Sequence, residues 1–222
     1  MFLVIIILMI FYKSNKSIFT SKLTKHIDGI DYKVIQDKDP DTAAKLLDAL
    51  NQFFYKIMRQ LKTERNNGQN FGKVTYFIDN LITKYNPSKI QEGYYIKEGE
   101  PGSKGENLPN GEPADTAYVM DKGRIFVMCL RDANGKFHDL NLLKFVAMHE
   151  ICHIGSIKEQ HEDEFWENFK WLLLYTSKRG LFTLVDYSKQ PIKYCGTLLV
   201  DSNPAFDDGV KTKEKIPDYI SS

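Results

Sequence analysis

Apolar residues recur at three- and four-residue steps in four stretches of this chain, which is the spacing of a helix that buries one face. Pro40 stands near the first position of the first stretch, Asn86-Pro87 follows the second, and Gly180 follows the fourth. Residues of these types commonly mark the ends of helices. We therefore expect four helices, at residues 39–63, 74–82, 140–155 and 165–178.

Shorter segments carry the alternating pattern of strands. Residues 32–35 follow a turn at residues 28–29, and residues 117–120 and 125–130 flank a turn at residues 121–124, which predicts a hairpin. The remaining short apolar runs are residues 184–187 and 194–200. Long helices with few short strands predict an α+β fold, in which helices pack on a small, mostly antiparallel sheet.

The chain opens on an apolar run, MFLVIIILMIFY, at residues 1–12. A membrane-spanning helix needs about 20 apolar residues, and no small-residue cleavage site follows this shorter run. These features favour an uncleaved N-terminal membrane anchor over a cleaved signal peptide. Lysines on its C-terminal side place the rest of the chain in the cytoplasm, or on the corresponding inner side of another membrane.

We divide the chain into an anchor (residues 1–12), a tether (13–27), a folded domain (28–203) and a polar tail (204–222) that is expected to be disordered. Inside the domain, residues 93–116 are rich in Gly, Pro and polar residues. This composition favours a solvated loop, and a lid over a cleft is the alternative.

Composition narrows the functional classes. A chain of 222 residues with 42% hydrophobic content can form one domain with its own core. Its 30 Lys and Arg balance 29 Asp and Glu, for a net charge of +1, which argues against nucleic acid as a partner. No feature indicates an oligomeric state.

The cysteine count is low and odd: Cys129, Cys152 and Cys195. Such a count predicts no disulfide framework and favours a reducing compartment. Cys152 is expected to pack as a small buried residue. Cys195 is a minor candidate for a metal ligand.

The predicted helix at residues 140–155 contains the pattern His149-Glu150-Ile151-Cys152-His153. Two histidines four residues apart lie one above the other on one helix face, where both imidazoles can bind one Zn²⁺. Glu150 lies beside that face, where its carboxylate can take a proton from a water without binding the metal. The pattern predicts a zinc site with Glu150 as general base.

A catalytic zinc site of this kind needs a third protein ligand and an open fourth position. His161 is the leading candidate, because Phe165 and Trp166 follow about one helical turn later and can bury the segment and fix the histidine. Four acidic residues compete for the role: Glu159, Glu162, Glu164 and Glu167.

A hydrolase of this type also needs a group that stabilises negative charge on the substrate oxygen. Tyr187 and Tyr194 are the candidates, and the alternative for each is a core tyrosine. We expect Tyr194 to be the catalytic one.

The segment HEICHIGSIKEQHEDEFW resembles the zincin metallopeptidases whose HExxH helix is followed by a short loop and His-x-x-x-Phe, notably the WLM and SprT-like families. It is also similar to metallopeptidase-like proteins of large DNA viruses, which carry the order FHD, HE, GH, FW and YCG. Here Phe137-His138-Asp139 and Tyr194-Cys195-Gly196 match the first and last of these. Two departures are a seven-residue loop between His153 and His161 and Gln160 in place of Gly.

The resemblance implies a zincin-like fold, with His149, His153 and His161 as zinc ligands and Glu150 as base. It also implies that residues 125–130 form the cleft-edge strand that pairs with an extended substrate. By the viral resemblance, the interior of a virion is an equivalent location for the domain.

The expected function is therefore a membrane-anchored zinc peptidase acting on a peptide or protein. Two alternatives remain open: a membrane-tethered zinc-binding protein without turnover, and proteolysis of DNA–protein crosslinks. The charge balance disfavours the second.

Overall fold

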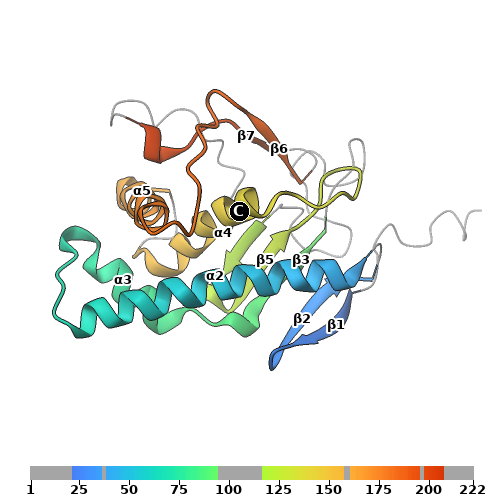
Figure 1. Ribbon diagram of the computed structural model, residues 1–222, viewed down its shortest axis with the longest axis horizontal. Coiled ribbons are helices and arrows are strands. Elements are labelled where there is room, and N and C mark those ends of the chain that lie inside the picture. The colour runs from blue at the N-terminus through green and yellow to red at the C-terminus, as the bar shows by residue number, and fades with distance from the viewer. Residues whose placement is uncertain (1–21, 37–38, 95–116, 158–160, 196–197, 208–222) are drawn as a thin grey trace, which may run out of the picture.

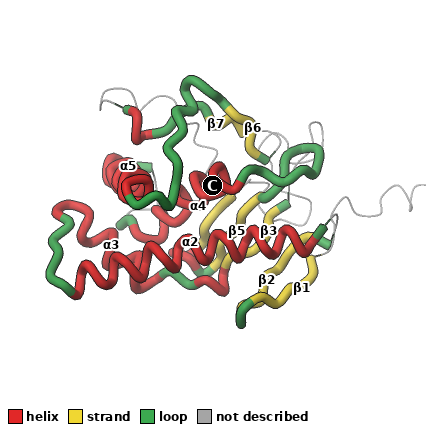
Figure 2. Tube along the Cα trace, in the orientation of Figure 1, coloured by secondary structure: helices red, strands yellow, loops and turns green. Residues whose placement is uncertain are grey.

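The computed structural model describes residues 22–36, 39–94, 117–157, 161–195 and 198–207. The expected anchor, most of the tether, nearly all of the 93–116 segment and most of the tail lie outside these residues. The described part has the predicted α+β architecture. In Figure 2 the strands of the main sheet lie together at one side, and α3 and α5 lie at the other.

The main sheet has the strand order β1-β2-β3-β5-β4. The pairs β1–β2 and β4–β5 are antiparallel, whereas β2–β3 and β3–β5 are parallel. The sheet is thus mixed, not mostly antiparallel as expected, because helices connect β2 to β3 and return the chain to the same end of the sheet. The strands are β1 (Lys22–Ile27), β2 (Ile30–Ile35), β3 (Ile90–Gly93), β4 (Ala117–Met120) and β5 (Ile125–Cys129).

Strand β3 was not expected, and strands β1 and β5 differ from the expectations stated for their residues. Strand β1 uses residues that were expected to form the tether, and it pairs with β2 along its whole length. Strand β5 lies between β3 and β4, so both of its edges are paired and it cannot receive a substrate strand. Among the described strands, the edge on that side of the sheet belongs to β4.

The described residues contain four α-helices: α2 (Pro40–Asn66), α3 (Thr75–Lys84), α4 (Leu140–Gly155) and α5 (Asp163–Lys178). Figure 1 shows α2 running across the sheet, with α3 folded back beside its C-terminal end. The ring of Phe54 on α2 lies 6.4 Å from that of Phe126 on β5, which joins helix and sheet in one core. A separate hairpin, β6 (Ile192–Tyr194) and β7 (Leu198–Val200), follows α5. The 3₁₀ turns are η1 (Gly72–Val74), η2 (Pro87–Lys89), η3 (Asp121–Gly123) and η4 (Pro204–Phe206).

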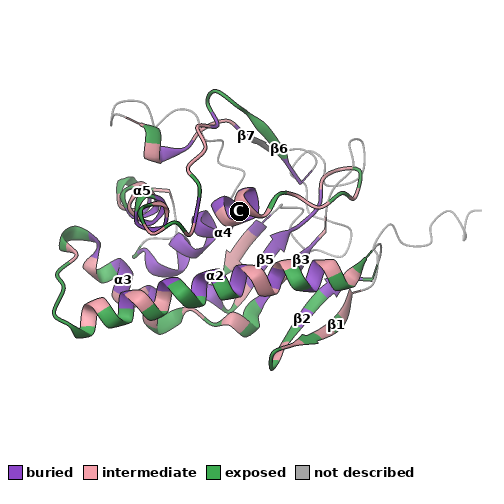
Figure 3. Ribbon diagram, in the orientation of Figure 1, coloured by how far each residue is buried: buried purple, intermediate pink, exposed green. Residues whose placement is uncertain are grey.

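Helix α4 is buried along most of its length (Figure 3). Every residue from 145 to 155 is buried. The apolar stripe predicted for this helix, which includes Leu143, Ala147 and Ile151, belongs to the main core. The histidine face is covered as well, because aromatic residues of α5 pack against it.

No helix within the described residues is long and apolar enough to cross a membrane. The expected anchor at residues 1–12 lies outside them.

Gly155→Ala is expected to destabilise the protein by about 1–3 kcal/mol, the typical cost of overpacking a close-packed core. An added Cβ would lie 2.5 Å from Cδ2 of Phe77 and 2.9 Å from Cγ of Leu81, both on α3. Thermal unfolding followed by circular dichroism measures the effect. An unchanged melting temperature would show that α3 and α4 can separate at no cost.

Candidate metal centre

Both ends of α4 are fixed by side chains, at the start by its own N-cap residue and at the end by residues from elsewhere in the chain. At the start, the carboxylate of Asp139 accepts a hydrogen bond from the backbone N–H of Asn141 at 2.8 Å, as an N-cap does. At the end, Asn80 Nδ2 donates to the carbonyl of Gly155 at 3.0 Å. Lys122 Nζ donates to the carbonyls of His153 at 3.2 Å and Ser156 at 3.1 Å.

Lys122 comes from the turn between β4 and β5 and adopts a left-handed conformation there, with φ 51°. A cation at the C-terminus of a helix is favourable because the last carbonyls carry partial negative charge. The lysine thereby ties the edge hairpin to the end of the helix that carries His153. Sequence reasoning missed this contact, because a lysine in a hairpin turn gives no signal of its partner.

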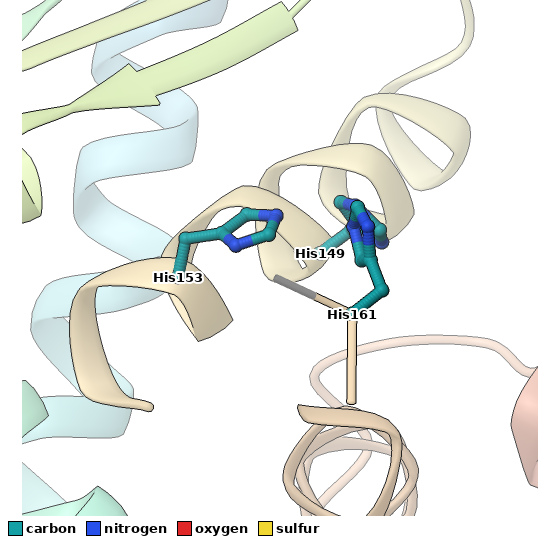
Figure 4. Close-up of side chains that lie close together, drawn as sticks. All are labelled: His149, His153 and His161. Carbon is teal, nitrogen blue, oxygen red and sulfur yellow. The ribbon is translucent and has the colours of Figure 1, made fainter. Parts of the chain in front are cut away.

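The three predicted histidines meet in space. One ring nitrogen from each of His149, His153 and His161 lies within 4.8 Å of the other two. The Nε2 atoms of His149 and His161 are 2.9 Å apart. Figure 4 shows two rings rising from α4 and the third reaching in from the segment before α5. These distances bracket the roughly 3.3 Å between two nitrogen ligands on a tetrahedral Zn²⁺ with Zn–N bonds of about 2.0–2.1 Å.

The electrostatics suit metal binding. Burial lowers the pKa of His149 well below its usual value, and the neighbouring charges of His153 and His161 act in the same direction. His149 is therefore a neutral imidazole near pH 7, and a neutral imidazole is the form that binds a metal. Because the three imidazoles lie so close together, binding of one metal cation between them is favoured over protonation of the rings.

The competing ligands lie elsewhere or are otherwise engaged. Within the described residues, the group of side chains able to hold a metal consists of the three histidines. Glu164 Oε1 instead accepts from the backbone N–H of Ile157 at 3.1 Å and from Asn168 Nδ2 at 3.2 Å, and so holds the loop after α4. Glu162 and Glu167 are exposed, and Glu159 lies outside the described residues.

Glu150 is fully buried on α4. Its charge raises the pKa of two neighbouring groups, the thiol of Cys152 and the phenol of Tyr194, although burial is the larger cause for both. Cys152 is a free, buried cysteine, as expected. The role of Glu150 as general base remains a prediction.

The two candidate tyrosines both contact residues other than the histidines. Tyr194 is fully buried, and its hydroxyl donates to the carbonyl of Cys129 at 2.6 Å. Tyr187 packs its ring 4.9 Å from that of Phe145, and burial raises its pKa to about 12. A catalytic role for Tyr194 remains a prediction, and it would require this hydroxyl to change its partner.

The cysteine expectation needs a correction, because Cys129 and Cys195 form a disulfide. The bond excludes Cys195 as a metal ligand. It joins the end of β5 to the residue after β6, across 66 positions of sequence. An odd cysteine count could not reveal this pairing, since only the fold brings the two residues together.

The FHD and YCG motifs meet at this disulfide. Nε2 of His138 accepts from the backbone N–H of Cys195 at 3.0 Å, and the His138 ring lies 5.0 Å from that of Tyr194. Asp139, the last residue of FHD, caps α4. The two motifs thus fix the start of the histidine-bearing helix to β5 and to the β6–β7 hairpin.

Comparison with known proteins finds viral relatives. The chain is 31% identical over 125 residues to uncharacterized protein R325 of Acanthamoeba polyphaga mimivirus. This match covers 56% of this chain and 60% of that protein. It is 34% identical over 83 residues to uncharacterized protein 136R of Invertebrate iridescent virus 6. This second match covers 36% of this chain and 44% of that protein. The match thus spans less than two thirds of either relative. No protein-family model matches the chain.

Among solved structures, the crystal structure of a Wss1 mutant from Saccharomyces cerevisiae matches with a TM-score of 0.37 and 16% identity, over 67% of this chain and 92% of that one. A TM-score below 0.5 does not establish a shared fold.

Proposed function

We propose that this protein is a zinc-dependent peptidase. The observation that carries the proposal is the meeting of His149, His153 and His161, with one ring nitrogen of each within 4.8 Å of the others. The buried Glu150, which follows His149 directly in α4, supports it. Three imidazoles with no fourth ligand among the described residues are the donor set of a catalytic zinc site, in which one position stays open.

A bound Zn²⁺ would supply a Lewis acid that polarises the substrate carbonyl and makes water acidic enough to react near pH 7. The chain's own residues do the rest. The His149, His153 and His161 imidazoles hold the ion, and the Glu150 carboxylate removes a proton from the attacking water. The same proton then passes from Glu150 to the nitrogen of the leaving amine as the C–N bond breaks, which returns the carboxylate to its starting state.

An extended peptide is the substrate class that best suits the surroundings. Among the described strands, β4 is the edge of the main sheet next to β5, and it packs against α4. An edge strand can pair with the main chain of an extended peptide and so align it without regard to sequence. We assign this role to β4 in place of β5.

A zinc-binding protein without turnover is the second candidate. One observation favours it: the Tyr194 hydroxyl is directed to the Cys129 carbonyl, not to the histidines. A buried glutamate next in sequence to the first ligand favours the peptidase, because a purely structural site has no need of that residue.

Metal content tests the site. The full-length wild type is expected to contain about one zinc per chain by elemental analysis, and His161→Ala is expected to lose most of it during dialysis. His26→Ala is the matched control, since His26 is exposed on β1 and pairs with Asp31. Absence of zinc from the wild type after zinc has been supplied would overturn the proposal, and equal zinc in His161→Ala would move the third ligand elsewhere.

A further inference from the structure

His161 is the ligand whose placement most needs an explanation. His149 and His153 are fixed by one helix, which sets their spacing. His161 instead precedes α5 and is only partly buried. A ligand on such a segment must be ordered either by the metal or by neighbouring side chains.

Trp166 makes two contacts with this histidine. Its indole Nε1 donates to the backbone carbonyl of His161 at 3.0 Å. Its ring also stacks on the imidazole, with centroids 5.4 Å apart and planes inclined by 24°. The first contact fixes the main chain of His161, and the second fixes the orientation of its side chain.

Trp166 is itself held firmly on α5. Its backbone N–H donates to the carbonyl of Glu162 at 3.2 Å, in the first turn of the helix. The neighbouring Phe165 ring is buried and lies 4.5 Å from His153 and 4.6 Å from His161. Trp166, which belongs to helix α5, therefore constrains His161 in the segment that precedes this helix.

We propose that Trp166 is the positioning residue of the metal centre. This inference rests on the proposed zinc site. Trp166 holds His161 beside the pair on α4 before a metal arrives, so that binding does not have to order the segment before α5. Partners of this kind, outside the ligand set, typically contribute about 10–100-fold to metal affinity.

Zinc affinity of full-length variants, measured by competition with a chromophoric chelator, tests the proposal. Trp166→Phe keeps an aromatic ring but removes the indole N–H, and we expect about 10-fold weaker binding. Trp166→Ala removes both contacts, and we expect a loss near 100-fold. Trp171→Phe is the matched control, because Trp171 lies on the same helix and packs on Tyr175, Phe71 and Phe77. It should bind zinc as the wild type does.

A spectroscopic measurement tests whether Trp166 lies against the bound metal, as its stacking on His161 requires. The chain has two tryptophans, so Trp171→Phe leaves Trp166 as the only one. Added Co²⁺ should strongly quench the fluorescence of Trp166 in that variant, because the indole stacks on a ligand. The same addition to Trp166→Phe should quench Trp171 only weakly. The measurement on Trp171→Phe keeps Trp166 in place and by itself does not depend on whether the Trp166 variants fold.

The outcomes separate this inference from the proposed function. A wild type that takes up neither Zn²⁺ nor Co²⁺ would remove the metal centre itself. Metal uptake by the wild type, with unchanged affinity in Trp166→Phe and Trp166→Ala, would overturn the role of Trp166 alone. So would metal uptake without quenching of Trp166 fluorescence.

Discussion

Glu150→Gln is expected to abolish peptide hydrolysis while leaving about one zinc per chain. The substitution keeps the size of the buried side chain and leaves the three imidazoles in place, but an amide cannot accept the proton of the attacking water. A positioned general base contributes about 10²- to 10⁴-fold to a rate. We therefore expect kcat to fall by at least about 100-fold, with little change in zinc content.

A mixture of unstructured peptides, analysed by mass spectrometry, provides the activity measurement, since no substrate needs to be assumed. Glu167→Gln is the matched control, because it makes the same chemical change at an exposed position of α5. It should retain both zinc and activity. Loss of zinc in Glu150→Gln would show that the carboxylate supports the metal site, and full activity in that variant would exclude it as the base.

If the wild type binds zinc but cleaves no peptide, the zinc-binding alternative gains support. The hydrogen bond of Tyr194 to the Cys129 carbonyl would then describe the working state of the protein. If the wild type does cleave peptide, Tyr194→Phe tests the role of this tyrosine. It should lower kcat if the hydroxyl turns toward substrate, and should change only stability if the hydroxyl stays with Cys129.

The parts of the fold that could be predicted are those set by local sequence. Helix α4 has its observed ends at the predicted residues, because Asp139 caps its start and the apolar periodicity is strong. The HExxH spacing then fixes two ligands with no further information. His161 could be proposed from the aromatic residues that follow it, and the structure does bring its ring nitrogen to the other two.

The parts that could not be predicted depend on pairing between distant segments. Strand β3 is a four-residue segment that becomes a central strand only because β2 and β5 lie on either side of it. Its insertion makes the sheet mixed and moves the free edge from β5 to β4. Two further features also depend on contacts between distant segments and could not be predicted. They are the hydrogen bond from Lys122 to the end of α4 and the Cys129–Cys195 disulfide.

Removing the Cys129–Cys195 disulfide is expected to lower the free energy of unfolding by about 4 kcal/mol. The bond closes a loop of 66 positions, and the chain-entropy model gives about this value for a loop of that length. Small domains are stable by only about 5–15 kcal/mol, so the loss would be a large part of the total. Cys195→Ser tests it by denaturant unfolding.

Reductant provides the internal control for this prediction. It should lower the unfolding midpoint of the wild type and leave that of Cys195→Ser unchanged, because the variant has no disulfide to lose. Thiol titration of the unreduced, denatured wild type should find only Cys152 reactive. Three reactive thiols would contradict the pairing and restore the reducing compartment that the cysteine count favoured. A confirmed bond would instead mean that the domain matures under oxidising conditions, with the start of α4 fastened through His138 to a covalently closed hairpin.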